Sequence, residues 1–187
     1  MPVPKKISRQ LGTHSRVDTI PFAMPIDTKG SQAIEAIFSI DAERAAKLLP
    51  DGNVHPFRLW NRGLLMITSV NYVHTDIGKY IEFSVAIACT RGRRPAPRLL
   101  PGVFMRHFGT GQYVIDLPVS SEISVKGGKG IWGMPKHQAN LDFKISKDNV
   151  SSQYELDGEL VMKLTIDRPK RTWLPVYASS PRRTAKS

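Results

Sequence analysis

The sequence lacks the features that mark disulfide-bonded, metal-rich or membrane-spanning chains. It has one cysteine, Cys89, in 187 residues, which excludes an intrachain disulfide and a cysteine-rich metal site and indicates a reducing compartment. The first six residues, MPVPKK, have no apolar run of the kind found in signal peptides, and no segment approaches the roughly 18 apolar residues of a membrane span. We therefore expect a soluble, cytoplasmic protein without a membrane partner.

Acidic residues are absent from both ends of the chain. Residues 1–16 hold four basic side chains and residues 168–187 hold six, so most of the net charge of +11 comes from the termini. No zinc-finger spacing, helix-turn-helix pattern or aromatic RNA-binding motif accompanies these charges. We expect solvated basic tails, and nucleic-acid binding through them is the least favoured of three functional alternatives.

The length and composition suit one folded domain with a sizeable core, since 41% of the residues are apolar. Short alternating or apolar segments predict strands at 33–40, 57–60, 64–73, 80–88, 103–108, 113–117, 141–145, 154–156 and 159–166. The run at 63–67 has no polar alternation, which predicts a strand covered on both faces. Turn signals at 109–112 and at Asp157-Gly158 predict hairpins.

Two short helices complete the expected elements. Asp41 is a suitable N-cap for a helix over 42–49, and Ser120 or Ser121 can cap a second helix that ends at Gly127-Gly128. Many short strands with few helices predict a mainly β (α+β) fold, an antiparallel barrel or sandwich.

The segment 80–88 has two different faces. Large apolar side chains occupy one face, and Tyr80, Glu82, Ser84, Ala86 and Ala88 form a smaller, partly polar one. If the smaller face lines a cavity, Glu82 points into it beside Tyr80. The alternative is that this face meets solvent.

The stretch 128–137, GKGIWGMPKH, places Lys136 behind glycines and large apolar residues. One interpretation is a surface lysine after a turn. The other is a reactive amine, because burial against Trp132 and Met134 favours the uncharged form that attacks a carbonyl group.

Four segments together resemble the acetoacetate decarboxylase family. The stretch 128–137 resembles the family's lysine loop, and Gly78-Lys79-Tyr80-Ile81-Glu82 resembles its Gly-x-Tyr-x-Glu strand. Residues 111–117 and 34–50 are similar to the strand before the lysine loop and to the first strand and helix. The resemblance spans about residues 20–168 and implies a cone-shaped antiparallel β-barrel with a few short helices and the lysine inside.

The resemblance also implies an activity. Acetoacetate decarboxylase activates its lysine through its surroundings to form a Schiff base with a keto acid. Lys136 and Glu82 would then be the catalytic residues of a lyase that decarboxylates a β-keto acid such as acetoacetate. His137, Trp132, Met134 and Tyr80 would bind substrate or tune the pKa of the lysine. The family implies neither a cofactor nor a metal, and it implies a homo-oligomer.

This chain departs from the family pattern at several positions. His137 stands where a second lysine is usual, Gly130 stands where a glutamate is usual, and the nearest match to an early arginine is Lys29. Family chains are also longer beyond the position of Ile166. Two further functions therefore stay open: aldol or dehydration chemistry on the same iminium, and a non-catalytic barrel that binds a small ligand.

The expected domain organisation follows from these observations. We expect a basic N-terminal arm over 1–19, the decarboxylase-like barrel domain over 20–178, and a basic C-terminal tail over 179–187.

Overall fold

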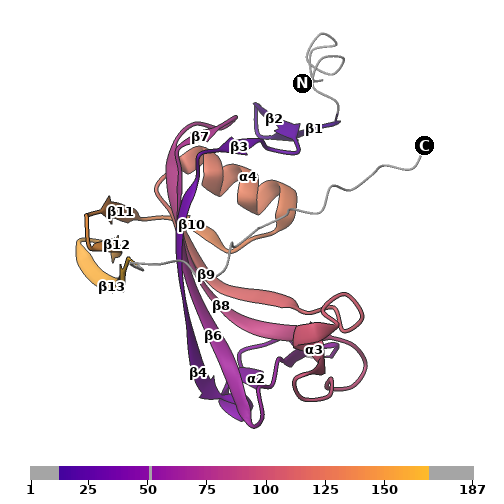
Figure 1. Ribbon diagram of the computed structural model, residues 1–187. Coiled ribbons are helices and arrows are strands. Elements are labelled where there is room, and N and C mark those ends of the chain that lie inside the picture. Colours follow the sequence, from indigo (N-terminus) through magenta and orange to yellow (C-terminus); the bar gives the residue numbers. More distant parts are fainter. Residues whose placement is uncertain (1–12, 51, 169–187) are drawn as a thin grey trace.

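The computed structural model describes residues 13–50 and 52–168. Its largest sheet has the strand order β10-β9-β8-β6-β4, and the short strand β5 also pairs with β8. These strands are β4 (Gln32–Asp41), β5 (Val54–Pro56), β6 (Arg62–Tyr72), β8 (Tyr80–Arg91), β9 (Gly111–Val119) and β10 (Lys136–Gln138). All neighbours are antiparallel except β10 and β9, which are parallel. The long strands β4, β6, β8 and β9 run side by side through the molecule (Figure 1).

Within 13–50 and 52–168, three smaller sheets accompany this one. They are the hairpin β1 (Thr13–Val17) and β2 (Ile20–Met24), the pair β3 (Thr28–Lys29) and β7 (His74–Thr75), and the three-stranded sheet β11 (Asn140–Ile145), β12 (Asn149–Leu156) and β13 (Glu159–Asp167). The helices in the described part of the chain are α2 (Ala42–Ala46), α3 (Leu100–Val103) and α4 (Glu122–Trp132). The mainly β prediction is confirmed. The strands of the described residues form no closed barrel, so the cone-shaped barrel is not confirmed.

The core lies on one face of the large sheet. Ile34, Ile67 and Phe83 lie on the same face of β4, β6 and β8 and belong to one buried cluster with Leu141, Tyr154 and Leu164 of the three-stranded sheet. The opposite face carries Glu82 and Tyr80, and α4 lies beside the ends of these strands next to β3 and β7 (Figure 1). The coverage predicted for both faces of 63–67 is incomplete, because Leu64, Leu65 and Met66 are only half-buried.

Both helices start where the sequence predicts, but neither ends there: α2 stops at Ala46, short of the predicted residue 49. Asp41 caps α2 by accepting a hydrogen bond from the Arg44 backbone N–H, and Ser121 is the N-cap of α4. The predicted end at Gly127-Gly128 is wrong, because α4 continues to Trp132 and closes at Gly133, whose φ of 63° suits a glycine. The internal glycines of α4 allow close packing with neighbouring elements instead of ending the helix.

Two predicted strands are absent. Residues 103–108 form the end of α3 and a series of turns, in which the Phe104 N–H donates to the Leu100 carbonyl. Pro101 suits the first turn of that helix, where a backbone N–H is not needed. Residues 57–60 do not form a strand either. Trp60 has a φ of 54°, outside the β region, and the strand in this part of the chain is β5.

The predicted domain boundaries fall partly outside the described residues. Residues 13–17 of the predicted N-terminal arm are strand β1, and Val17 packs against α4 at Gly130. Residues 1–12 and the predicted tail 179–187 lie outside the described part of the chain. None of the helices in 13–50 and 52–168 combines the length and apolar character needed to cross a membrane.

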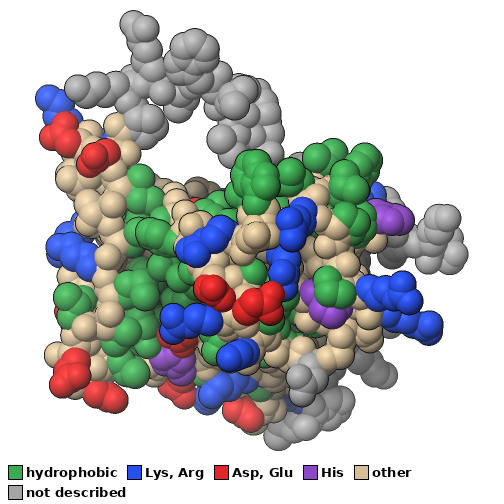
Figure 2. Space-filling view, turned by 90° about the horizontal axis from the view of Figure 1, so that it is seen from below, with side chains coloured by type: hydrophobic (Ala, Val, Ile, Leu, Met, Phe, Trp, Pro, Cys, Tyr) green, Lys and Arg blue, Asp and Glu red, His purple; other side chains and the backbone are tan. Residues whose placement is uncertain are grey.

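Apolar side chains are also present on the surface. The segment around α3 exposes Leu99, Leu100, Val103, Phe104 and Met105. Figure 2, which views the molecule from below, shows apolar side chains gathered in patches among basic and acidic ones.

Candidate functional site

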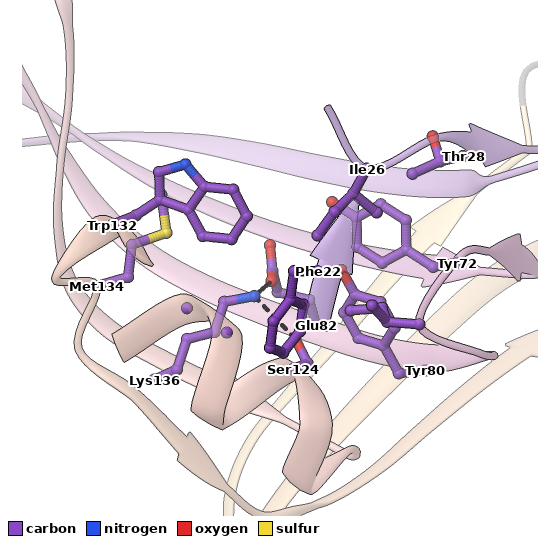
Figure 3. Close-up of a pocket in the computed structure, with 13 residues that line it drawn as sticks. Phe22, Ile26, Thr28, Tyr72, Tyr80, Glu82, Ser124, Trp132, Met134 and Lys136 are labelled. Atoms are coloured by element: carbon purple, nitrogen blue, oxygen red, sulfur yellow. Dashed lines mark hydrogen bonds and ion pairs between the residues drawn. The ribbon is translucent and has the colours of Figure 1, made fainter. Parts of the chain in front are cut away.

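A cavity of about 220 Å³ lies between α4 and the polar face of β8. Both elements belong to the segments singled out in the sequence, and the hairpin β1–β2 supplies part of the wall. The lining residues are Phe22, Ile26, Thr28, Tyr72, Ile77, Tyr80, Glu82, Ser124, Gly127, Gly128, Trp132, Met134 and Lys136. Figure 3 shows the Lys136 amine and the Glu82 carboxylate pointing toward each other inside this pocket.

Lys136 is a buried amine with two polar partners. It is 6% exposed, its Nζ lies 2.6 Å from Glu82 Oε2, and it donates a hydrogen bond of 2.9 Å to Ser124 Oγ. A buried charge is tolerated when it is paired and hydrogen-bonded. The amine and the carboxylate are therefore held within direct proton-transfer distance.

Two strands and a helix produce this arrangement. Lys136 opens β10, which pairs with β9 so that Lys136 lies opposite Leu117. Glu82 is on β8, where it lies opposite Val119 of β9. Ser124 is in the first turn of α4, which follows β9 directly. Lys136, Glu82 and Ser124, which come from three different elements, therefore meet beside the C-terminal end of β9.

The glycines of α4 make room for the lysine. A Cβ at Gly128 would overlap Lys136 Cδ and lie 2.9 Å from its Cε, and a Cβ at Gly127 would lie 2.7 Å from Phe22 Cε1. Each glycine inside a helix costs about 0.5–1 kcal/mol relative to alanine. Close contact of the helix backbone with Lys136 and Phe22 offsets that cost.

An aromatic pair forms one wall of the pocket. The rings of Tyr72 and Tyr80 stack with centroids 4.6 Å apart, and Lys136 Nζ lies 5.5 Å from the Tyr80 centroid. Burial, followed by the nearby Glu82 charge, raises the pKa of Tyr80 to about 12. The same two causes raise the pKa of Tyr72. Both phenols are therefore uncharged at pH 7 and can donate hydrogen bonds.

Trp132 and Met134 lie in the pocket lining, but they do not bury the amine as expected. Trp132 is 45% exposed and Met134 is 40% exposed. The lysine stem is covered by the backbone of α4 at Gly128, and Phe22, which is 1% exposed, lies in the same lining. Trp132 and Met134 therefore form a part of the pocket lining that is open to solvent.

His137 does not line the pocket. Successive residues of a strand point to opposite faces, so His137 points away from the side that Lys136 occupies. Its Nε2 lies 2.8 Å from Asp116 Oδ1 on β9. His137 therefore links β10 to β9 through Asp116 and does not approach the Lys136 amine.

The sequence interpretation missed Phe22, Tyr72 and Ser124. Phe22 reaches the pocket through the β1–β2 hairpin, and Tyr72 reaches it because it lies opposite Tyr80 across β6 and β8. The only available signal for Ser124 was its place one turn after the N-cap Ser121. No spacing rule pairs that position with Lys136.

The fold and the pocket define a class of protein: a β-rich chain in which a helix covers a buried lysine–carboxylate pair. Residues 12–181 match the family model described as Acetoacetate decarboxylase (ADC). The chain therefore belongs to the acetoacetate decarboxylase family.

Two solved structures share the fold. The acetoacetate decarboxylase of Legionella pneumophila superposes with a TM-score of 0.65 at 14% identity, over 91% of this chain and 56% of that one. A second acetoacetate decarboxylase structure gives a TM-score of 0.59 at 14% identity, over 75% of this chain and 50% of that one. The chain thus spans about half the length of these proteins. No curated protein matches the sequence significantly.

Proposed function

We propose that the chain is a Schiff-base-forming enzyme in which Lys136 attacks the carbonyl group of a small substrate. The observation that supports this most directly is the buried Lys136 amine between Glu82 and Ser124 in an otherwise largely apolar pocket. An ordinary lysine, with a pKa of about 10.4, is almost entirely protonated at pH 7. A base within hydrogen-bond distance is therefore needed, and Glu82 is that base.

The steps follow from these contacts. Glu82 takes a proton from the Lys136 ammonium, and the free amine adds to the carbonyl carbon. The carbinolamine oxygen then leaves as water after receiving a proton, which Glu82 returns. The product is an iminium that carries one positive charge beside the Glu82 carboxylate. Ser124 holds the nitrogen in place while these bonds form and break.

The family name suggests decarboxylation of a small β-keto acid such as acetoacetate. In that reaction the iminium accepts the electron pair of the breaking carbon–carbon bond, and carbon dioxide leaves. The resulting enamine is protonated, and water then releases the lysine.

Aldol or dehydration chemistry is a second candidate. It uses the same iminium, but it does not require a carboxylate in the substrate. The Glu82 charge beside the amine favours this candidate, since it repels a second anion at that position.

Borohydride trapping tests the shared Schiff-base step. The protein is incubated with acetoacetate, other keto acids and simple ketones, and then reduced with sodium borohydride. We expect a stable mass increase that fragment analysis assigns to Lys136. The adduct should be lost in Lys136→Ala and retained in Lys129→Ala, an exposed position on α4. Absence of any adduct in folded wild-type protein would favour the non-catalytic ligand-binding alternative.

We also propose that the chain forms a homo-oligomer. The exposed apolar side chains around α3, of which Val103 is 75% exposed, support an interface there. Light scattering should give a mass above that of one chain, and Val103→Glu together with Phe104→Glu should lower it. A monomeric wild-type protein would refute the proposal.

A further inference from the structure

We infer that the Lys136 pocket takes an uncharged aldehyde or ketone with an apolar or aromatic substituent, in preference to a keto acid. This inference rests on the proposed Schiff-base function and names its substrate class. It follows from the charges in the pocket, the position of Lys29 in a separate hollow, and the character of the walls.

The two charges in the described lining already neutralise each other. Lys136 and Glu82 form a pair at 2.6 Å, and their side chains are 8% and 17% exposed. The iminium carries one positive charge, as the ammonium does, so the net charge of the pair with Glu82 stays zero. A substrate carboxylate would add a second negative charge to a poorly solvated site that holds one cation. An uncharged carbonyl compound leaves the site neutral at every step.

Lys29 directly follows the pocket residue Thr28 in the sequence, but its side chain lies in a different hollow. Thr28 lines the pocket, whereas Lys29 lines a separate hollow with Asp27, His74, Thr75 and Asp76. The alternation of the short strand β3 separates these two side chains. Lys29 therefore does not offer its charge to a carboxylate bound beside Lys136.

The remaining walls suit an apolar group. Phe22, Ile26 and Ile77 contribute carbon surface, and the stacked pair Tyr72 and Tyr80 contributes aromatic surface. Half-exposed Trp132 and Met134 extend the apolar lining toward solvent, where a substituent can cover them. The cavity of about 220 Å³ is smaller than the roughly 300–1,000 Å³ that holds drug-sized ligands. A small aryl or branched alkyl carbonyl compound fits this description.

The chemical step is balanced without another reactant. The lysine nitrogen forms a bond to the carbonyl carbon, the carbon–oxygen bond breaks, and the oxygen leaves as water. Both protons of that water come from the Lys136 ammonium, one of them carried by Glu82. No atom is oxidised or reduced until borohydride supplies hydride in the test.

A matched pair of ketones tests the charge preference. 4-Oxopentanoate and its methyl ester share a carbon skeleton, and their carboxyl group is remote from the ketone. Trapping rates at Lys136 are measured for the full chain and divided by the rates for a lysine-containing model peptide. We expect the ester to be trapped at least tenfold faster than the acid. Equal rates, or faster trapping of the acid, would overturn the inference. If neither is trapped in folded protein, and no other carbonyl compound is, the proposed function fails instead.

A designed cation provides the second test. Thr28 is exposed at the edge of the pocket, so Thr28→Arg adds a guanidinium that can pair with a carboxylate. The ester-to-acid ratio should fall at least tenfold in Thr28→Arg. It should stay unchanged in the control Gln32→Arg, which places the same charge on exposed β4 outside the lining. An unchanged ratio in a folded Thr28→Arg protein would show that charge does not set the preference.

Discussion

The side chain of Lys136 crosses helix α4 at Gly128, so closely that the lysine methylene groups occupy the space of a Cβ at that position. The helix backbone thus forms the floor on which the amine lies, and Ser124 of the same helix accepts its hydrogen bond. This contact makes the position of Lys136 sensitive to single atoms in α4.

Gly128→Ala should therefore destabilise the protein, although alanine is the better helix former. The helix gains about 0.5–1 kcal/mol from the substitution, but overpacking against Lys136 costs typically about 1–3 kcal/mol. We expect a net loss of stability in urea unfolding and at least a tenfold slower trapping at Lys136. Lys129→Ala, one residue along and exposed, should change neither quantity. A Gly128→Ala protein with wild-type trapping would contradict the close contact.

Ser124→Ala should reduce trapping by misplacing the amine. Ser124 is 1% exposed and supplies one of the two polar partners of Lys136 Nζ. Its loss should cost about 1 kcal/mol of stability and slow the trapping rate about threefold to tenfold. Ser121→Ala is the matched control, because it removes the N-cap of the same helix at a similar cost of about 1 kcal/mol. Trapping by the folded control should equal that of the wild type, whereas equal loss in both variants would indicate a general helix effect.

His137→Gln should affect stability more than chemistry. The imidazole contacts Asp116 on the neighbouring strand and does not line the pocket. Because both side chains are partly exposed, we expect a loss of about 0.2–1 kcal/mol and trapping within about twofold of the wild type. Asp116→Asn should have the same effects. The double variant should lose less stability than the sum of the losses in the two single variants. A trapping loss of tenfold or more in His137→Gln alone would restore a role for this residue in tuning the amine.

Tyr80 should make stability depend on alkaline pH. Burial and the Glu82 charge raise its pKa to about 12 in the folded protein, above the value of about 10 in an unfolded chain. Between these values the folded state binds more protons than the unfolded state, so its contribution is complete below pH 10 and declines as the pH rises toward 12. Urea unfolding between pH 9 and 11 should show this decline, and Tyr80→Phe should flatten it. The slope that remains in Tyr80→Phe contains the contributions of Tyr72, Tyr154 and Cys89, whose pKa values burial also raises.

The strand at 80–88 and its two site residues, Glu82 and Tyr80, could be predicted because they depend on local pattern. The alternation of 80–88 placed Glu82 and Tyr80 on the face opposite Phe83, and the structure has this arrangement. The caps at Asp41 and Ser121 were predictable since a side-chain oxygen and a nearby backbone N–H suffice to form them.

Predictions that relied on distant partners were less successful. Gly127 and Gly128 have the composition of a helix end, yet they lie inside α4 because Phe22 and Lys136 occupy the space beside them. The apolar segment 103–108 has the composition of a strand, but it pairs with no strand and closes into turns after α3. The predicted closed barrel also depends on long-range pairing, which no short pattern specifies.

The sequence by itself determined that this is a β-rich chain with a lysine in an apolar, glycine-rich segment and a glutamate on an alternating strand. Periodicity and residue type suffice for that, since they act over a few neighbouring residues. Only the tertiary structure decided that Lys136 meets Glu82 and Ser124, that His137 faces away, and that Lys29 points into a different hollow. Those outcomes depend on strand register and on the approach of α4 to β10, where a shift of one residue would point each side chain to the opposite face.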